Sequence, residues 1–292
     1  IMTYNATQLQ LTHVLQRLYR RVGGKVLFAT GGSTSTVIDT KLIDDLAESN
    51  EDDIYNGGTI IVIDDAGGAN AAPEGEFSRI TDYDALNATA TFSPVLTTAI
   101  ASGDRVIIAP VDFPLYDMVE VVNDALKSLG DIPSMDTSIT TIAGQYEYTL
   151  PLALKGRELL KVEMIGNGDQ KYSEVPNWRV TPATAGSTGT ILFPSLSDGF
   201  SIRITSAGKH PRVEAFDDFI NEYIHPEVVH AVVYAHALQW KNDSSLISGG
   251  ADQALLSLEQ KAWSQLDRAK YEHKIEIPPR RVQGFPSWGN PL

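Results

Sequence analysis

The chain has 292 residues, with 37 acidic and 23 basic side chains, a formal net charge of −14 and no cysteine. Tight binding to nucleic acid is not expected, because phosphate contacts need clustered Lys and Arg. The lack of cysteine excludes disulfides, thiolate metal ligands and thiol catalysis, and no apolar run approaches the roughly 20 residues of a membrane-spanning helix.

Residues 1–24 are predicted to contain an N-terminal helix over 5–22, with Asn5 as its cap. Leu and Val recur there at helical spacing, and a glycine pair ends the pattern. Residues 25–111 are predicted to form a small β module, because short apolar runs alternate with glycine pairs and Asp-rich turns. The expected strands are 25–30, 36–39, 59–64, 76–83, 88–93 and 104–109.

Within this module, residues 76–93 read as a hairpin around 84–87, and Gly31-Gly32 as the break after the first strand. A second amphipathic helix is expected over residues 112–130, with Asp112 as its cap and Pro114 in its first turn.

A second β region is predicted over residues 131–210. A C-terminal helical region follows over 211–275, because apolar residues recur there at helical spacing. Within the β region, residues 179–189 are rich in Thr, Ala and Gly and are expected to form a surface loop. The expected strands of the β region are 138–142, 145–150, 158–166, 189–193 and 200–206.

The helical region is expected to contain two helices. His225-Pro226 marks the start of the first helix or a kink in it, because the residue before a proline avoids the helical region, and the break at 248–250 follows this helix. The expected apolar stripe of the second helix consists of Leu255, Leu258, Ala262, Leu266 and Ala269.

Residues 276–292 are predicted to form an extended C-terminal arm, because no helix can run through their prolines. Strands and helices come in blocks along the chain, which is typical of an α+β fold. The expected architecture is therefore small antiparallel β modules combined with a helical bundle and the arm.

Four patterns that could carry chemistry fall short of their motifs. Residues 29–35 lack the lysine and the helix of a phosphate loop, and the acidic segment 44–53 lacks the spacing of a calcium loop. Glu227 and His230 have a usable metal spacing, but no matching pair exists on another helix. No Gly-x-Ser-x-Gly elbow supports a hydrolase. We therefore expect no enzyme, no cofactor and no metal site.

The arm carries Arg280, Arg281, Phe285 and Trp288. Aromatic residues and Arg are the usual anchors of protein interfaces. These four residues are therefore predicted to dock into a neighbouring subunit, with the two Arg supplying charge contacts. The alternative is a tail that folds back on its own domain or stays disordered.

Turn-rich segments of the first β module carry a resemblance to a known family. They are DIYNGG at 53–58, GEFSRITDYD at 75–84, ATFSP at 90–94 and ASGDR at 101–105. Followed by a helix, a long helical region and a Pro/Arg/Trp tail, they resemble the head-to-tail adaptor proteins of the neck of tailed bacteriophages. The chain departs from the simplest adaptors, which are compact helical bundles, in its length and its second β region.

The resemblance implies a structural virion protein, assembled in the host cytoplasm, that forms a homo-oligomeric ring below the portal protein. Rings of this family are often dodecameric, and the arm would reach the neighbouring subunit or the portal protein. A tail or nozzle protein would lie below. From the net charge of −14 we expect an acidic lumen through which DNA passes without specific binding, and no membrane contact.

Two alternatives remain. Another tail structural protein, such as a tail-tube, terminator or baseplate protein, shares such β modules, although the helical block at 214–274 disfavours a tail tube, which is predominantly β. A carbohydrate-binding β module is the other alternative, but the β modules contain a single tryptophan, Trp178, for a sugar platform.

Overall fold

The chain folds into two compact units, which are taken separately below. The first unit holds residues up to 128 together with 211–274, and the second holds residues 129–210 with the C-terminal segment from 275. The fold class of the chain is α+β with antiparallel sheets, as the sequence predicts. The computed structural model describes residues 9–43, 52–68, 72–166, 168–181, 188–194, 196–247 and 252–279.

The first unit contains a seven-stranded antiparallel sheet. Its strands are β1 (Lys25–Phe28), β2 (Gly31–Gly32), β3 (Thr36–Ile38), β4 (Thr59–Asp64), β5 (Phe77–Asp84), β6 (Thr89–Ser93) and β7 (Arg105–Ala109). They lie in the order β1-β7-β4-β5-β6-β3-β2. Only Ala29 and Thr30 separate β1 from β2 along the chain, so the sheet curls until its two end strands approach each other. The enclosed face buries Ile60, Ile80 and Phe92.

β5 and β6 form the predicted hairpin around residues 84–87. The predicted break at Gly31-Gly32 is wrong, because this pair forms β2 and aligns with Ile38 and Val37 of β3. A Cβ on Gly32 would lie 2.4 Å from the carbonyl oxygen of Thr36, so only glycine permits this close pairing.

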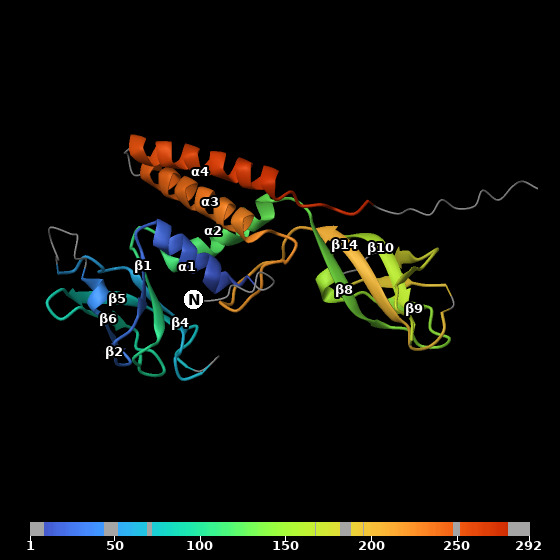
Figure 1. Ribbon diagram of the computed structural model, residues 1–292, viewed down its shortest axis with the longest axis horizontal. Helices are drawn as coiled ribbons and strands as arrows, with labels where there is room; N and C mark the ends of the chain where they lie inside the picture. Colours follow the sequence, from blue (N-terminus) through green and yellow to red (C-terminus); the bar gives the residue numbers. More distant parts are fainter. Residues whose placement is uncertain are drawn as a thin grey trace, which may run out of the picture. The chain divides into compact units, whose positions relative to one another are not determined.

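Four helices of the described chain belong to the first unit: α1 (Leu11–Arg21), α2 (Leu115–Ser128), α3 (Pro226–Ile247) and α4 (Gln253–Glu272). α1 also packs against β1 and β7 of the sheet. α3 packs against α1, α2 and α4, and Figure 1 shows α4 lying along α3 on the side away from α1 and α2. α3 is apolar on several faces because it is enclosed by the other helices.

Both predicted N-caps need correction. α1 begins at Leu11, because Gln10 is extended and forms a β-bridge with Phe219, so Asn5 does not cap it; Asn5 itself lies outside the described residues. α2 begins at Leu115, and the Asp112 carboxylate accepts a hydrogen bond from Lys241 Nζ at 2.8 Å instead of capping the helix.

α3 begins at Pro226, so His225-Pro226 marks a helix start and not a kink, whereas the predicted break at 248–250 lies outside the described residues. The apolar stripe predicted for α4 is only partly correct. Ala262, Leu266 and Ala269 are buried, but Leu258 is 47% exposed because α3 covers a single face of this outer helix.

The second unit contains two antiparallel sheets, in the orders β11-β10-β14-β8 and β12-β13-β9. Their strands are β8 (Ile132–Thr140), β9 (Glu147–Thr149), β10 (Glu158–Ile165), β11 (Ser173–Glu174), β12 (Arg179–Thr181), β13 (Thr190–Leu192) and β14 (Ser201–Gly208). β8 starts six residues before the predicted 138. The strand includes Pro133, which is tolerated because β8 is an edge strand of its sheet, where a residue without an N–H group can lie.

A buried ion triad crosses the larger sheet of the second unit. The Glu163 side chain is 8% exposed and pairs with Lys161 on its own strand and with Arg203 on β14, at 2.8 Å. Burial raises the pKa of Glu163, but the hydrogen bonds from Lys161 and Arg203 outweigh it, so that the net pKa is lowered.

We therefore expect Glu163→Ala to lower the free energy of unfolding by about 3 kcal/mol, because it leaves two cations without their buried partner. Urea denaturation monitored by circular dichroism measures this loss. Glu158→Ala, at the exposed start of the same strand, is the matched control and should cost less than about 1 kcal/mol. Equal losses for the two variants would contradict the buried triad.

Candidate functional site

A pocket of about 630 Å³ opens in the first unit beside the start of α1. Its other walls are the end of β4, residues 74–77, Arg105 at the start of β7, and residues 214–217. Residues 211–218 form an extended segment between the second unit and α3, which we call the strap. The strap has no regular secondary structure of its own, so its position depends on side-chain contacts.

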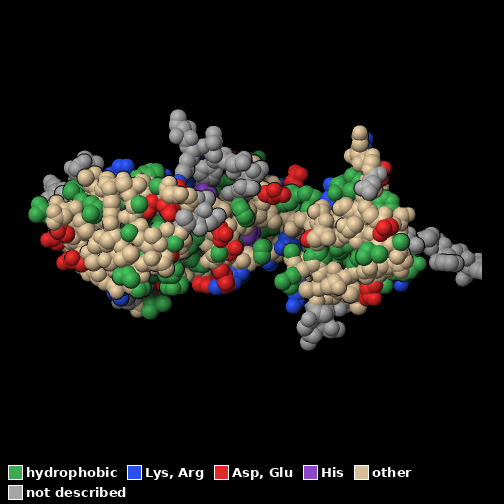
Figure 2. All heavy atoms as spheres, turned by 90° about the horizontal axis from the view of Figure 1, so that it is seen from below, with side chains coloured by type: hydrophobic (Ala, Val, Ile, Leu, Met, Phe, Trp, Pro, Cys, Tyr) green, Lys and Arg blue, Asp and Glu red, His purple; other side chains and the backbone are tan. Residues whose placement is uncertain are grey.

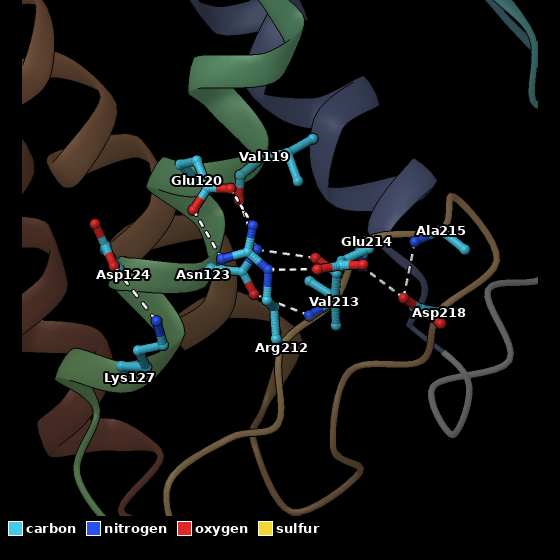
Figure 3. A network of polar contacts seen from close by, with 10 residues as sticks. All are labelled: Val119, Glu120, Asn123, Asp124, Lys127, Arg212, Val213, Glu214, Ala215 and Asp218. Carbon is cyan, nitrogen blue, oxygen red and sulfur yellow. Dashed lines mark hydrogen bonds and ion pairs between the residues drawn. The ribbon is translucent and has the colours of Figure 1, made fainter.

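Surface ion pairs hold the outer side of the strap against α2 (Figure 3). Arg212 donates hydrogen bonds from both terminal nitrogens to the two carboxylate oxygens of Glu120, and from Nε to Glu214 at 2.6 Å. These bonds lower the pKa of Glu120 and raise the pKa of Arg212. Because all three side chains are exposed, the pairs orient the strap more than they stabilise it.

A buried amide holds the inner side of the strap. Asn123 of α2 is 1% exposed; its Nδ2 donates to the carbonyl of Val213 at 2.9 Å, and its Oδ1 accepts from the N–H of Val213 at 2.8 Å (Figure 3). Nδ2 also donates to the carbonyl of Val119 at 2.9 Å. The Asn123 side chain thus provides hydrogen-bond partners for both the N–H and the carbonyl of Val213, a buried residue that lies in no strand or helix.

The strap in turn caps α1. The Asp218 carboxylate accepts from the N–H groups of Glu214 and Ala215, which closes the end of the strap into a turn. The backbone carbonyls of Asp218 and Phe216 accept from the N–H groups of Leu11 and Thr12, both at 3.0 Å. These are among the first N–H groups of a helix, which have no partner within it. The wall of the pocket is therefore fixed from two sides.

The pocket is acidic. Four carboxylates line it, those of Asp64, Glu74, Glu214 and Asp217. Asp64 pairs with Arg105, which also lines the pocket, and Glu214 pairs with Arg212 of the strap. His13 also lines the pocket, and burial together with the charge of Arg105 lowers its pKa, which favours the neutral imidazole. Figure 2 shows acidic side chains scattered over the visible face of the molecule, in keeping with the net charge of −14.

Aromatic rings give the same pocket an apolar part. Phe77 and Phe216 line it and meet edge to face, with ring centroids 6.2 Å apart. Phe77 also packs edge to face against Tyr116, at 5.4 Å. A ligand that binds both the carboxylates and the aromatic rings of this pocket combines a positive charge with an aromatic or apolar group. Carboxylates and the faces of aromatic rings attract cations, and aromatic rings pack edge to face against other rings. A basic, aromatic peptide has this chemistry.

A second cluster lies at the end of the α3–α4 hairpin. His225 and Glu227 at the start of α3 and His273 at the end of α4 place their ligand atoms within 4.8 Å of one another. His273 Nε2 lies 3.0 Å from Glu227 Oε2. This group could hold a metal ion. The sequence did not suggest it, because His225 and His273 are brought together only by the antiparallel packing of two helices.

The Glu227–His230 pair considered from the sequence does not form a site. Glu227 is exposed and faces His273, whereas His230 is buried beside Arg17, Arg21 and Tyr234. Burial, followed by the charges of Arg17, Arg21 and His13, lowers the pKa of His230 to about 3. Both residues lie on α3, as their helical spacing predicts, but the Glu227 side chain points to solvent and the His230 side chain points into the interior.

The other candidate segments are placed only in part. The four predicted interface residues, Arg280, Arg281, Phe285 and Trp288, lie outside the described residues. Of the acidic segment 44–53, Asp52 and Asp53 are described. Asp53 accepts a hydrogen bond from the side chain of the nearby Asn56, whereas Asp52 accepts one from the N–H of the distant Ala85, at the end of β5.

Comparisons with known proteins add no identity to these sites. No helix in the described ranges is long and apolar enough to cross a membrane. A scan against protein-family models finds no match to the chain, and a search of curated proteins finds none either.

Proposed function

We propose that the chain is a structural virion protein, a head-to-tail adaptor that forms a ring below the portal protein and a conduit for DNA. The turn-rich segments of the first β module and the long α3–α4 hairpin support this function. The observation that carries it is the chemical match between the acidic, aromatic pocket and the C-terminal arm of the same sequence.

The arm supplies the complement to each part of the pocket. Arg280 and Arg281 suit the pocket carboxylates, and Phe285 and Trp288 suit its two phenylalanine rings. Residues 280–292 can span up to roughly 40 Å when extended, which is enough to reach an adjoining subunit. An arm that enters the pocket of the next copy makes a head-to-tail interface, and repeated interfaces of this type close into a ring.

Exposed apolar side chains of the helical hairpin support packing between copies. Ile247 of α3 is 88% exposed and Tyr271 of α4 is 89% exposed, in addition to the half-exposed Leu258. In the proposed ring, these three apolar side chains would become covered where copies pack against the hairpin. The acidic charge of the chain suits a ring through which DNA slides, because like charges repel.

Charge reversal tests the arm and the pocket together. In Arg280→Glu/Arg281→Glu, we expect assembly, alone or on the cognate portal protein, to weaken by about 100-fold. Adding Glu74→Lys/Asp217→Lys should restore it in part, because the charges are exchanged. Native mass spectrometry and negative-stain microscopy measure the oligomer. Lys274→Glu, an exposed position just before the arm, is the matched control and should assemble normally.

Annular particles that are lost and regained with the charges would support the proposal. Full assembly of the charge-reversed arm would contradict the docking of the arm into the pocket. A strict monomer, with and without the portal protein, would contradict the adaptor function, and affinity of that monomer for sugars would favour the carbohydrate-binding alternative.

A further inference from the structure

We infer that His225, Glu227 and His273 bind a zinc ion that clasps the open end of the α3–α4 hairpin. Their three ligand atoms lie within 4.8 Å of one another and come from two different helices. Two imidazoles and one carboxylate are a ligand set that Zn²⁺ accepts, with a fourth position left for water or another group. This inference does not depend on the adaptor function.

The fold presents all three side chains at one place. The carbonyl of His225 accepts the N–H groups of Val228 and Val229, so this residue sits at the boundary of α3, and Glu227 follows in the first turn. His273 is the C-cap of α4, which runs back along α3. The start of one helix and the end of the next therefore meet at the cluster, where a shared ion would link them.

The contacts within the cluster bring the ligand side chains together, but one histidine ring must turn before both can bind the same ion. The rings of His225 and His273 stack with centroids 3.6 Å apart and planes inclined by 11°. A ring nitrogen directs its lone pair within the ring plane, so one imidazole must turn out of the stack for both to reach the same ion. The backbone N–H of Glu227 lies 3.3 Å from Nδ1 of His225, a weak contact that leaves this ring able to turn.

The surrounding charges are balanced. Arg268 and Glu272 of α4 lie near the cluster and pair with each other at 2.8 Å. The Arg268 guanidinium therefore already has a carboxylate partner on its own helix, and Glu227 contacts His273 of the cluster.

A clasp at this place would matter because α4 is held by few side chains. It buries only Ala262, Leu266 and Ala269 among its described residues, and the chain leaves the helix directly after His273. An ion between His273 and the start of α3 would secure the last turn of α4 and fix the point at which the following segment departs.

Titration of Zn²⁺ into the EDTA-treated, dialysed full-length chain tests the inference. We expect one ion per chain by isothermal titration calorimetry, and binding at least about 10-fold weaker in His273→Ala and in Glu227→Gln. Co²⁺ should give the visible absorption of a tetrahedral site, and that absorption should be lost in both variants. His236→Ala, a histidine elsewhere on α3, is the matched control and should bind as the native chain does.

Thermal unfolding supplies a second readout. Zn²⁺ should raise the melting temperature of the native chain and of the control, and should leave that of His273→Ala unchanged, because an ion stabilises only the state that binds it. Equal Zn²⁺ affinity in the native chain and His273→Ala would overturn the inference, as would the absence of any Co²⁺ absorption in the native chain.

Discussion

Replacing Asn123 with alanine is expected to lower the free energy of unfolding by about 4 kcal/mol, because two buried backbone groups each lose a partner worth about 1–3 kcal/mol. The N–H and the carbonyl of Val213 both bond to this one amide, which is 1% exposed. Water cannot replace it without opening the contact between α2 and the strap. The strap should then exchange its amide hydrogens faster at residues 211–218.

Urea denaturation and hydrogen exchange measure these two effects. Glu120→Ala is the matched control, since Glu120 binds the same strap through the exposed Arg212 and its loss should cost less than about 1 kcal/mol. A loss for Asn123→Ala no larger than that of the control would contradict the buried anchor. So would unchanged exchange of the strap.

Acidification should destabilise the first unit through His230. The unfolded chain takes up this proton near the ordinary pKa of 6.5, whereas burial and the charges of Arg17 and Arg21 hold the folded pKa at about 3. The unfolded state therefore binds more protons between these values, so the stability contributed by the neutral imidazole is present above pH 6.5 and falls as the pH falls. The full loss by about pH 3 approaches about 5 kcal/mol.

The variant His230→Leu tests this linkage, because leucine cannot take up a proton. Its free energy of unfolding should fall less steeply with decreasing pH than that of the native chain. Val233→Ala, a buried neighbour on the same helix face, is the matched control: it should lower stability by a similar amount at every pH and keep the native slope. An unchanged slope in His230→Leu would refute the buried neutral histidine.

Local patterns predicted the elements well where local interactions decide them. The hairpin of β5 and β6 follows from its turn residues, and the start of α3 follows from Pro226. The predictions were wrong where a contact between residues far apart in the sequence sets the boundary of an element. The start of α1 moves to Leu11 because Gln10 pairs with Phe219, more than 200 residues further along the chain. β8 extends through Pro133 because it is an edge strand of its sheet.

The candidate sites depend on such distant contacts still more strongly. A polar Asn123 on an otherwise apolar helix face was a visible signal, because buried amides need partners, but nothing local names Val213 as that partner. Similarly, helical spacing paired Glu227 with His230, whereas the packing of α4 pairs it with His273. The docking of Arg280, Arg281, Phe285 and Trp288 stays a prediction.

The strap also bears on the order in which the protein can acquire its structure during synthesis. Residues 129–210 of the second unit are contiguous and leave the ribosome before the strap, α3 and α4, which complete the first unit. Until then, the N–H groups at the start of α1 and the side-chain amide of Asn123 lack their partners in the strap. Residues 129–210 are translated during this interval and can fold on their own. The strap, α3 and α4 thus complete the unit that was begun first, although they are made after residues 129–210.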